Sequence, residues 1–256
     1  MPVHDVAQRG FDAGADAYER ARPSYSDETV AWLIKNLAIG PGRRVCDLAA
    51  GTGKLTRLLF PAGAWLVAVE PVDGMSRYLR SVLPEVPLLA ATAECLPFDR
   101  ATLDAVTVAQ AFHWFDADRA FAELSRVLRP GGRLGLIWNA RDRSEPWVDE
   151  MWGIMDRFEK RAPWRDHDRW SNAALGERAG FGPLHSAEFR HEQRLTPDDV
   201  VQRFASVSHI AALEPSGRDA VLDKVRSVLE AHPDTAGKSE LVIPYRVDAY
   251  WCERLP

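Results

Sequence analysis

Between positions 44 and 139 the chain alternates short apolar segments with segments of helical periodicity, and this alternation restricts the fold more than any other feature. The apolar segments predict five strands, at Arg44–Leu48, Trp65–Glu70, Val86–Ala91, Leu103–Gln110 and Arg133–Asn139. The periodic segments predict helices from Ser26 or Asp27 to the turn at Gly40, and at Lys54–Phe60, Asp73–Leu83 and Asp116–Leu128. Strands that alternate with helices are joined by right-handed crossovers. The sequence therefore predicts an α/β fold with a parallel sheet covered on both faces.

The pattern changes after the fifth strand. Residues 140–180 are polar, helical in pattern and rich in tryptophan, and they predict a helical insertion. Beyond it we expect a strand near Leu184–Arg194, helices near Pro197–Val207 and Pro215–His232, and a last strand at Glu240–Cys252. The chain has no internal repeat and no low-complexity segment. One domain over residues 1–256, with the insertion after strand five, is the simplest organisation.

Charge and cysteine content exclude several classes of partner. The net charge is −5, and no long cluster of Lys or Arg is present, which disfavours nucleic acid as a main partner. Cys46, Cys95 and Cys252 are far apart and match no metal-ligand spacing, so we expect no metal site and a reducing compartment. The N-terminus resembles no signal peptide, and no apolar run could cross a bilayer. We expect a cytoplasmic location.

A glycine turn follows the first strand. The stretch VCDLAAGTG (Val45–Gly53) ends in two glycines, where a parallel sheet places its ligands. Glycine accepts positive φ angles and lets the backbone approach a ligand closely. Glu70 ends the next strand, and a carboxylate there can accept both hydroxyl protons of a ribose. The turn and the acid together predict a cofactor that contains adenosine.

Two departures separate this turn from the dinucleotide fingerprint G-x-G-x-x-G. Thr56 stands where the third glycine would present a helix N-terminus to a pyrophosphate. Asp47, inside the strand, would repel a pyrophosphate, but it suits the cationic amino-acid end of S-adenosylmethionine. The pattern therefore favours S-adenosylmethionine, with NAD and an oxidoreductase activity as the alternative.

At these residues the sequence resembles the class I S-adenosylmethionine-dependent methyltransferases, in particular the group of small-molecule enzymes that includes trans-aconitate methyltransferase-like proteins. The resemblance extends from Gln8 to about Asn139, with Ala49 where the family usually has its first glycine. The matching motifs are VCDLAAGTG, VAVEP, ATAECLPFD, AQAFHWFD, LRPGGRLGLIWN and the N-terminal FDAGADAYERARPSY. The resemblance implies a Rossmann-like sheet of seven strands, mostly parallel, with the last one antiparallel.

The resemblance also implies a set of cofactor-binding residues. They are the turn residues Asp47, Ala49, Gly51 and Gly53, the second-motif residues Glu70, Pro71 and Met75, the adenine-edge residues Ala93 and Glu94, Gln110 at the methionine end, and Tyr18 and Arg22 at the methionine carboxylate. Glu70 would bind the ribose, and Asp47 would anchor the loop. Residues 1–25 would cover the cofactor.

His113 follows Gln110 at the predicted carboxyl edge of the sheet, and it is the only candidate catalytic residue. It could serve as a general base, since histidine titrates near neutral pH. It could also pack the start of the next helix, which is the interpretation we favour. The tryptophans of segment 140–180 could form an apolar lid on the substrate side or ordinary packing, and nothing in the sequence decides between them.

The predicted activity is in-line methyl transfer from S-adenosylmethionine to a small molecule, with S-adenosylhomocysteine as the product. O-methylation of a carboxylate or a hydroxyl is the expected reaction. A protein that binds the cofactor without catalysis is the second alternative. The arginines of the insertion, among them Arg141, could receive a carboxylate, or they could form a solvated helical face. The methyl acceptor and the oligomeric state cannot be read from the sequence.

Overall fold

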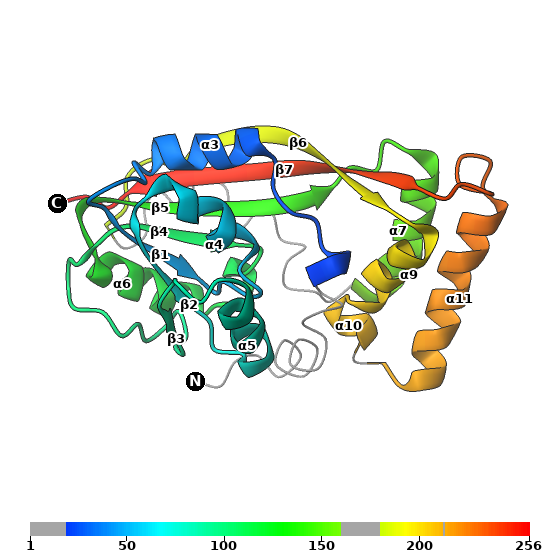
Figure 1. The fold of residues 1–256 in the computed structure, drawn as a ribbon, viewed down its shortest axis with the longest axis horizontal. Coiled ribbons are helices and arrows are strands. Elements are labelled where there is room, and N and C mark those ends of the chain that lie inside the picture. The colour runs from blue at the N-terminus through cyan, green and yellow to red at the C-terminus, as the bar shows by residue number, and fades with distance from the viewer. Residues whose placement is uncertain (1–18, 160–179, 212) are drawn as a thin grey trace.

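The computed structural model describes residues 19–159, 180–211 and 213–256, and it contains one seven-stranded sheet (Figure 1). The strands are β1 (Arg44–Leu48), β2 (Trp65–Val69), β3 (Leu88–Leu89), β4 (Leu103–Ala109), β5 (Leu128–Arg141), β6 (His185–Leu195) and β7 (Leu241–Glu253). Their order in the sheet is β3-β2-β1-β4-β5-β7-β6. All neighbours pair in parallel except β7, which is antiparallel to both β5 and β6. This confirms the predicted fold class.

Helices cover both faces of the sheet. The α-helices are α3 (Asp27–Asn36), α4 (Lys54–Leu59), α5 (Asp73–Val82), α6 (Ala117–Val127), α7 (Pro146–Glu159), α9 (Pro197–Ala205), α10 (Ser208–Ala211) and α11 (Pro215–Ala231). Two short 3-10 helices, η1 (Phe60–Ala62) and η2 (Phe112–Trp114), complete the set. Alternate residues of β1 lie in different cores: Val45 packs with α3, α4 and α5, and Cys46 packs with α6.

Two strands differ in length from the prediction. β3 has only two residues, because it is an edge strand that pairs with β2 alone and follows Pro87, which cannot donate a backbone hydrogen bond. β5 starts five residues earlier than expected, at Leu128. Gly131 has a φ of +76°, and the pairing with β4 is irregular there, so the Pro-Gly-Gly sequence is a bulge inside the strand. Gly131 and Arg254 also continue the pairing with the C-terminal end of β7.

A second hydrophobic core lies at the far end of β6 and β7. There α7, α9, α10 and α11 pack around the Leu195 and Leu241 ends of the two strands, and we call this unit the helical lobe (Figure 1). α7 lies in the segment predicted to be helical, and its Trp147 and Trp152 are buried in the core of the helical lobe. Residues 160–179 of that segment, including Trp164 and Trp170, lie outside the described residues.

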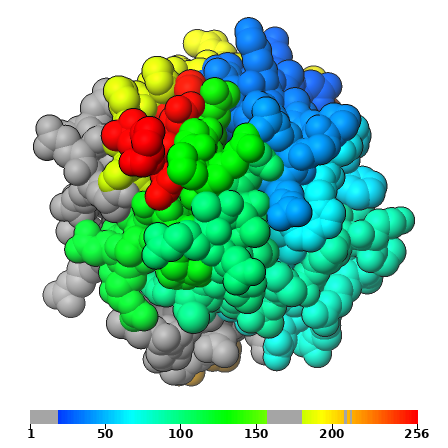
Figure 2. Space-filling model, turned by 90° about the vertical axis from the view of Figure 1, so that its left-hand side faces the viewer, coloured from blue at the N-terminus to red at the C-terminus, as the bar shows by residue number. Residues whose placement is uncertain are grey.

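The two ends of the sheet have different surroundings. The carboxyl end of β5 points toward the helical lobe (Figure 1), where Arg141 contacts Trp152 of α7. The opposite end is shown in Figure 2, where the C-terminal residues (red) lie beside the segment that begins β5. Parallel sheets bind ligands beyond the carboxyl ends of their strands, so we expect the functional site at that end.

Within the described ranges, no helix combines the length and the apolar composition needed to cross a bilayer.

Candidate functional site

The turn after β1 is held in an unusual backbone conformation. Ala49, Gly51 and Gly53 have φ angles of 55°, 58° and 82°, in the left-handed region that favours glycine. The backbone N–H of Ala50 donates to the Val69 carbonyl at 3.1 Å and fixes the turn to β2. Ala49, which stands where the family has glycine, thus adopts a glycine-like conformation as an alanine. Such a strained residue is typical of a functional loop.

Glu70 joins the turn to the end of β2. Its side chain is buried, Oε2 accepts the backbone N–H of Gly51 at 2.8 Å, and Oε1 accepts that of Val72 at 2.8 Å. Burial raises the pKa of this carboxyl to about 7, against the effect of the two backbone hydrogen bonds. Each carboxylate oxygen has a second lone pair, so Glu70 can still accept further hydroxyl protons.

Asp47 is a buried anchor between three elements. Its Oδ2 accepts the Thr56 hydroxyl of α4 at 2.6 Å, and its Oδ1 accepts the Thr107 hydroxyl of β4 at 2.8 Å. Burial raises the pKa of Asp47 to about 6, although these hydrogen bonds favour the ionised form. The arrangement explains why an acid is tolerated inside a core strand. It also gives a physical reason for Thr56, where a dinucleotide site would have glycine.

Glu19 closes over the glycine turn from the N-terminal side. Its carboxylate accepts the Thr52 hydroxyl at 2.5 Å, pairs with Lys54 at 3.2 Å and accepts a hydrogen bond from Arg57. Burial opposes the ionisation of Glu19, yet the hydrogen bond from Thr52 and the charges of Lys54 and Arg57 hold its pKa below the usual range. This cluster is absent from the sequence-based predictions, because nothing local in the sequence pairs Glu19 with residues more than thirty positions away.

The predicted adenine-side residues lie in α5 and on the loops that follow β2 and β3. Met75 is buried in α5, and Ala93 is buried in the sheet core. Pro71 is half-buried next to Glu70. The Oε1 atom of Glu94 accepts the backbone N–H of Asp116 at 2.9 Å, which ties its loop to the start of α6. Glu94 therefore has a structural contact in addition to its predicted contact with adenine.

At the carboxyl ends of β4 and β5, two buried polar atoms have no hydrogen-bond partner among residues 19–159, 180–211 and 213–256. They are Nε2 of Gln110 and Oδ1 of Asn139. Gln110 also has a φ of 59°, and its backbone N–H donates to the Ile137 carbonyl at 2.9 Å. A buried polar atom without a partner is costly, so both positions are where a ligand could supply the missing contact.

His113 lies in η2 and contacts the tip of β5. Its Nδ1 accepts the indole N–H of Trp138 at 3.4 Å, and its ring packs against Trp114 at a centroid distance of 5.0 Å. In the neutral ring the proton is then on Nε2, which makes that atom a donor and not a base. The contact favours the packing role for His113 over the general base.

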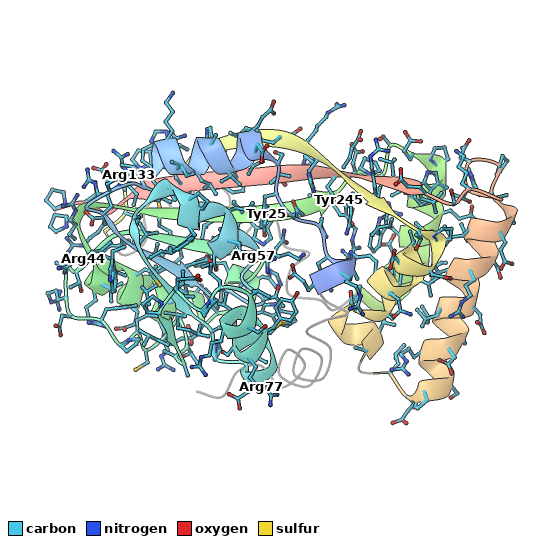
Figure 3. The ribbon with its side chains drawn as sticks, viewed as in Figure 1. Tyr25, Arg44, Arg57, Arg77, Arg133 and Tyr245 are labelled. Atoms are coloured by element: carbon cyan, nitrogen blue, oxygen red, sulfur yellow. The ribbon has the colours of Figure 1, made fainter. Side chains whose placement is uncertain are left out.

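Residues 19–25 run between the sheet and the helical lobe. Arg22 donates from Nη2 to the Ser206 carbonyl at the end of α9, at 2.9 Å. The Ala21 carbonyl accepts from the Gln193 amide of β6 at 3.2 Å. The Ser24 carbonyl accepts from the Asn139 amide of β5 at 3.1 Å. Tyr25 is buried in the core of the sheet and Tyr245 in that of the helical lobe, and Figure 3 labels both. Tyr18 lies outside the described residues.

The structure thus brings most of the predicted residues to one edge of the sheet. Those that follow β1, β2 and β4 directly are Ala49, Gly51, Gly53, Glu70, Pro71 and Gln110. Arg22, in the N-terminal segment, donates instead to the Ser206 carbonyl of the helical lobe. The described residues contain no group of three His, Cys, Asp or Glu side chains that could hold a metal ion.

Comparison with known proteins gives a consistent family. The family model of a methyltransferase domain matches residues 46–136, which includes the glycine turn and the ends of β2 and β4. The chain is 43% identical over 235 residues to the uncharacterized methyltransferase Rv3342 of Mycobacterium tuberculosis H37Rv, covering 92% of this chain and 91% of that protein. It is 31% identical over 255 residues to the methyltransferase-like C25B8.10 of Schizosaccharomyces pombe, covering 99% of each.

A solved structure shares the fold at low sequence identity. Phosphoethanolamine N-methyltransferase 2 of Haemonchus contortus, crystallised with S-adenosyl-L-methionine, has a TM-score of 0.59 and 16% identity, over 100% of this chain and 60% of that one. This likeness concerns the fold alone. The two sequence relatives, by contrast, extend over both the sheet and the helical lobe.

Proposed function

Because the chain belongs to the S-adenosylmethionine-dependent methyltransferases, we propose that it transfers a methyl group from S-adenosylmethionine to an oxygen of a small molecule. The observation that carries the proposal is the hydrogen bond from the backbone N–H of Gly51 to the side chain of Glu70, which places a buried carboxylate against the glycine turn. A carboxylate at this position can accept the two hydroxyl protons of a ribose.

The residues present fit this cofactor. A Cβ atom built on Gly51 would meet nothing within 4 Å, so the backbone here borders open space that a ligand can approach. The amide of Gln110, whose Nε2 has no hydrogen-bond partner among the described residues, provides a donor for a carboxylate at the other end of the ligand. The Haemonchus enzyme with the same fold was crystallised with this cofactor, which supports the assignment.

The charges around the turn argue against a dinucleotide. Asp47 and Glu70 are both buried beside it, and each carries a negative charge when ionised. A pyrophosphate would be repelled, whereas the sulfonium and ammonium groups of S-adenosylmethionine would be attracted. Gly53 precedes α4, and Thr56 is engaged with Asp47, so the third glycine of a dinucleotide site is replaced by a structural contact.

The chain's residues would mainly position the reactants. S-adenosylmethionine supplies a methyl group on a sulfonium that is already activated for displacement. Residues 1–25 would cover the cofactor, and segment 140–180 with the helical lobe would face the methyl acceptor. Because Nδ1 of His113 accepts from Trp138, we expect no strong base from this residue. A carboxylate or an acidic hydroxyl is therefore the best acceptor, since it needs little help to lose its proton.

Calorimetric titration with S-adenosylhomocysteine tests the cofactor assignment. We expect S-adenosylhomocysteine to bind the wild type. Its affinity for Glu70→Gln should be lower by about tenfold or more, as expected for the loss of a charged hydrogen bond. Glu240→Gln is the control, because Glu240 forms an exposed pair with Arg194 at the far end of β7. Binding of NAD in place of S-adenosylhomocysteine would contradict the proposal. Equal affinity of the wild type and Glu70→Gln would contradict the pose.

A further inference from the structure

The helical lobe buries an arginine that has no acidic partner. Arg203 lies in α9, and its side chain is only 4% exposed. Its Nε and Nη1 atoms are buried and have no hydrogen-bond partner within the part of the chain that the structure describes. Among the described residues, no acidic side chain forms an ion pair with it. A guanidinium stays ionised in proteins, and a buried charge without a counter-ion is strongly unfavourable, so the site is incomplete as it stands.

A second arginine lies beside the same aromatic ring. The Cζ atom of Arg203 is 5.4 Å from the ring centroid of Trp152, and that of Arg141 is 4.0 Å from it. Trp152 also stacks on Phe204, with ring centroids 4.6 Å apart. The indole therefore contacts two guanidinium groups inside the lobe.

Two acids of α7, the helix that carries Trp152, are already engaged. Asp149 and Asp156 of α7 both pair with Arg143, at 2.5 Å and 3.0 Å. Arg143 is thus neutralised twice, whereas Arg203 has no such partner among the described residues. The charge of Arg203 is therefore not balanced by any of the described side chains.

The arginine pair lies next to the proposed methyl-transfer site. Arg141 ends β5, two residues beyond Asn139, whose Oδ1 is buried without a partner. Residues two apart on a strand share one face. Arg203 is three residues before Ser206, whose carbonyl accepts from Arg22. Among the described residues, buried polar atoms without hydrogen-bond partners thus occur at Gln110 and Asn139, at the edge of the sheet, and at Arg203 in the lobe.

We propose that Arg203 binds an oxyanion of the methyl acceptor, either a carboxylate or a phosphate. This inference rests on the proposed function, and it adds the substrate class. The planar guanidinium offers several N–H donors that match such an anion. The anion is an anchor, separate from the oxygen that receives the methyl group. It holds one end of the acceptor against Trp152 and directs the other end toward Gln110.

Thermal denaturation and calorimetry with two probes test the site. Inorganic phosphate and succinate are each titrated into the wild type at matched ionic strength in chloride. We expect one of them to bind and to raise the Tm, because a ligand that binds only the folded state stabilises it. Preference for succinate indicates a carboxylate, and preference for phosphate indicates a phosphorylated acceptor. No response to either anion beyond that to chloride would overturn the inference.

Three variants identify the residue responsible. Arg203→Gln should weaken anion binding about tenfold or more, the ratio expected for one charged hydrogen-bonding group. Arg203→Lys keeps the charge but loses the planar donor set, so its affinity for the anion should lie between those of the wild type and Arg203→Gln. Arg194→Gln on β6 is the matched control and should bind as the wild type does, because its partner is the exposed Glu240. If Arg203→Gln does not fold, wild-type affinity in Arg203→Lys would overturn the assignment.

The same samples separate this inference from the proposed function. Each variant is also titrated with S-adenosylhomocysteine, which should bind with unchanged affinity, because the proposed cofactor contacts do not include Arg203. Failure of S-adenosylhomocysteine to bind the wild type would contradict the proposed function. Binding of S-adenosylhomocysteine without any anion response would contradict the oxyanion site alone.

Discussion

Gly51 and Gly53 have similar backbone angles but different surroundings. A Cβ atom on Gly53 would lie 2.2 Å from Cδ1 of Leu79, whereas one on Gly51 would meet nothing within 4 Å. We expect Gly53→Ala to lower the free energy of unfolding by about 2 kcal/mol or more, from positive φ and overpacking. Gly51→Ala should lower the free energy of unfolding by about 1 kcal/mol, because of its positive φ alone, and should also weaken the binding of S-adenosylhomocysteine. Urea denaturation measures the loss of stability, and calorimetry measures the binding. Equal losses of stability in the two variants would contradict the different surroundings of Gly51 and Gly53.

Glu70 makes the stability of the protein depend on pH. Burial raises its pKa from the ordinary value of 4.5 to about 7, so the folded state holds this proton more tightly than the unfolded chain. The stability from this group is fully present below pH 4.5 and is lost as the pH rises through 7. The loss is on the order of 3 kcal/mol, from about 1.4 kcal/mol for each pKa unit.

The comparison of wild type and Glu70→Gln isolates this contribution. Other acids, such as Glu19 with its lowered pKa, change stability in the opposite direction and are present in both proteins. We therefore expect the wild type to lose stability relative to Glu70→Gln between about pH 4.5 and 7. Urea denaturation at several pH values in this range measures the difference. A difference that stays constant with pH would contradict the raised pKa.

At the scale of elements, the sequence predicted strands and helices where the periodicity is long and the pattern continuous. β1, β2, β4 and α6 lie within two residues of their expected bounds. The prediction was less accurate for β5, because Pro-Gly-Gly normally ends a strand and here forms a bulge that the end of β7 supports. It was also less accurate for β3, whose length depends on a single neighbour in the sheet.

The predicted site shows the same division between local and distant information. Glu70 and the glycine turn were predictable, because their spacing along the chain follows from one strand–helix–strand unit. The contacts of Glu19 with α4 and the burial of Arg203 beside Trp152 were not, since they join residues that are far apart in the sequence. Single-sequence patterns carry no signal for such pairs. The acceptor side of the molecule is built mainly from contacts of this second kind.

At the scale of the whole molecule, β6 and β7 connect the sheet to the helical lobe. In β7, Leu241, Ile243 and Tyr245 belong to the core of the lobe, and Val247 and Ala249 belong to the core under α3. One uninterrupted strand thus contributes to two hydrophobic cores. Because the backbone pairing with β5 and β6 is continuous between them, we expect the lobe and the sheet to unfold together.

Ile243→Ala tests this coupling. Ile243 is fully buried in the lobe, so its truncation should lower the free energy of unfolding by about 2–5 kcal/mol. Val242→Ala is the matched control, because its side chain is only partly buried on the other face of the strand, and it should cost much less. Hydrogen exchange of the backbone amides at increasing urea concentration reports separately on the lobe, through α9 and α11, and on the sheet, through β1 and β4. Coincident transitions in wild type and variant would support one cooperative unit, whereas an earlier loss of protection in α9 and α11 of Ile243→Ala would show that the lobe unfolds by itself.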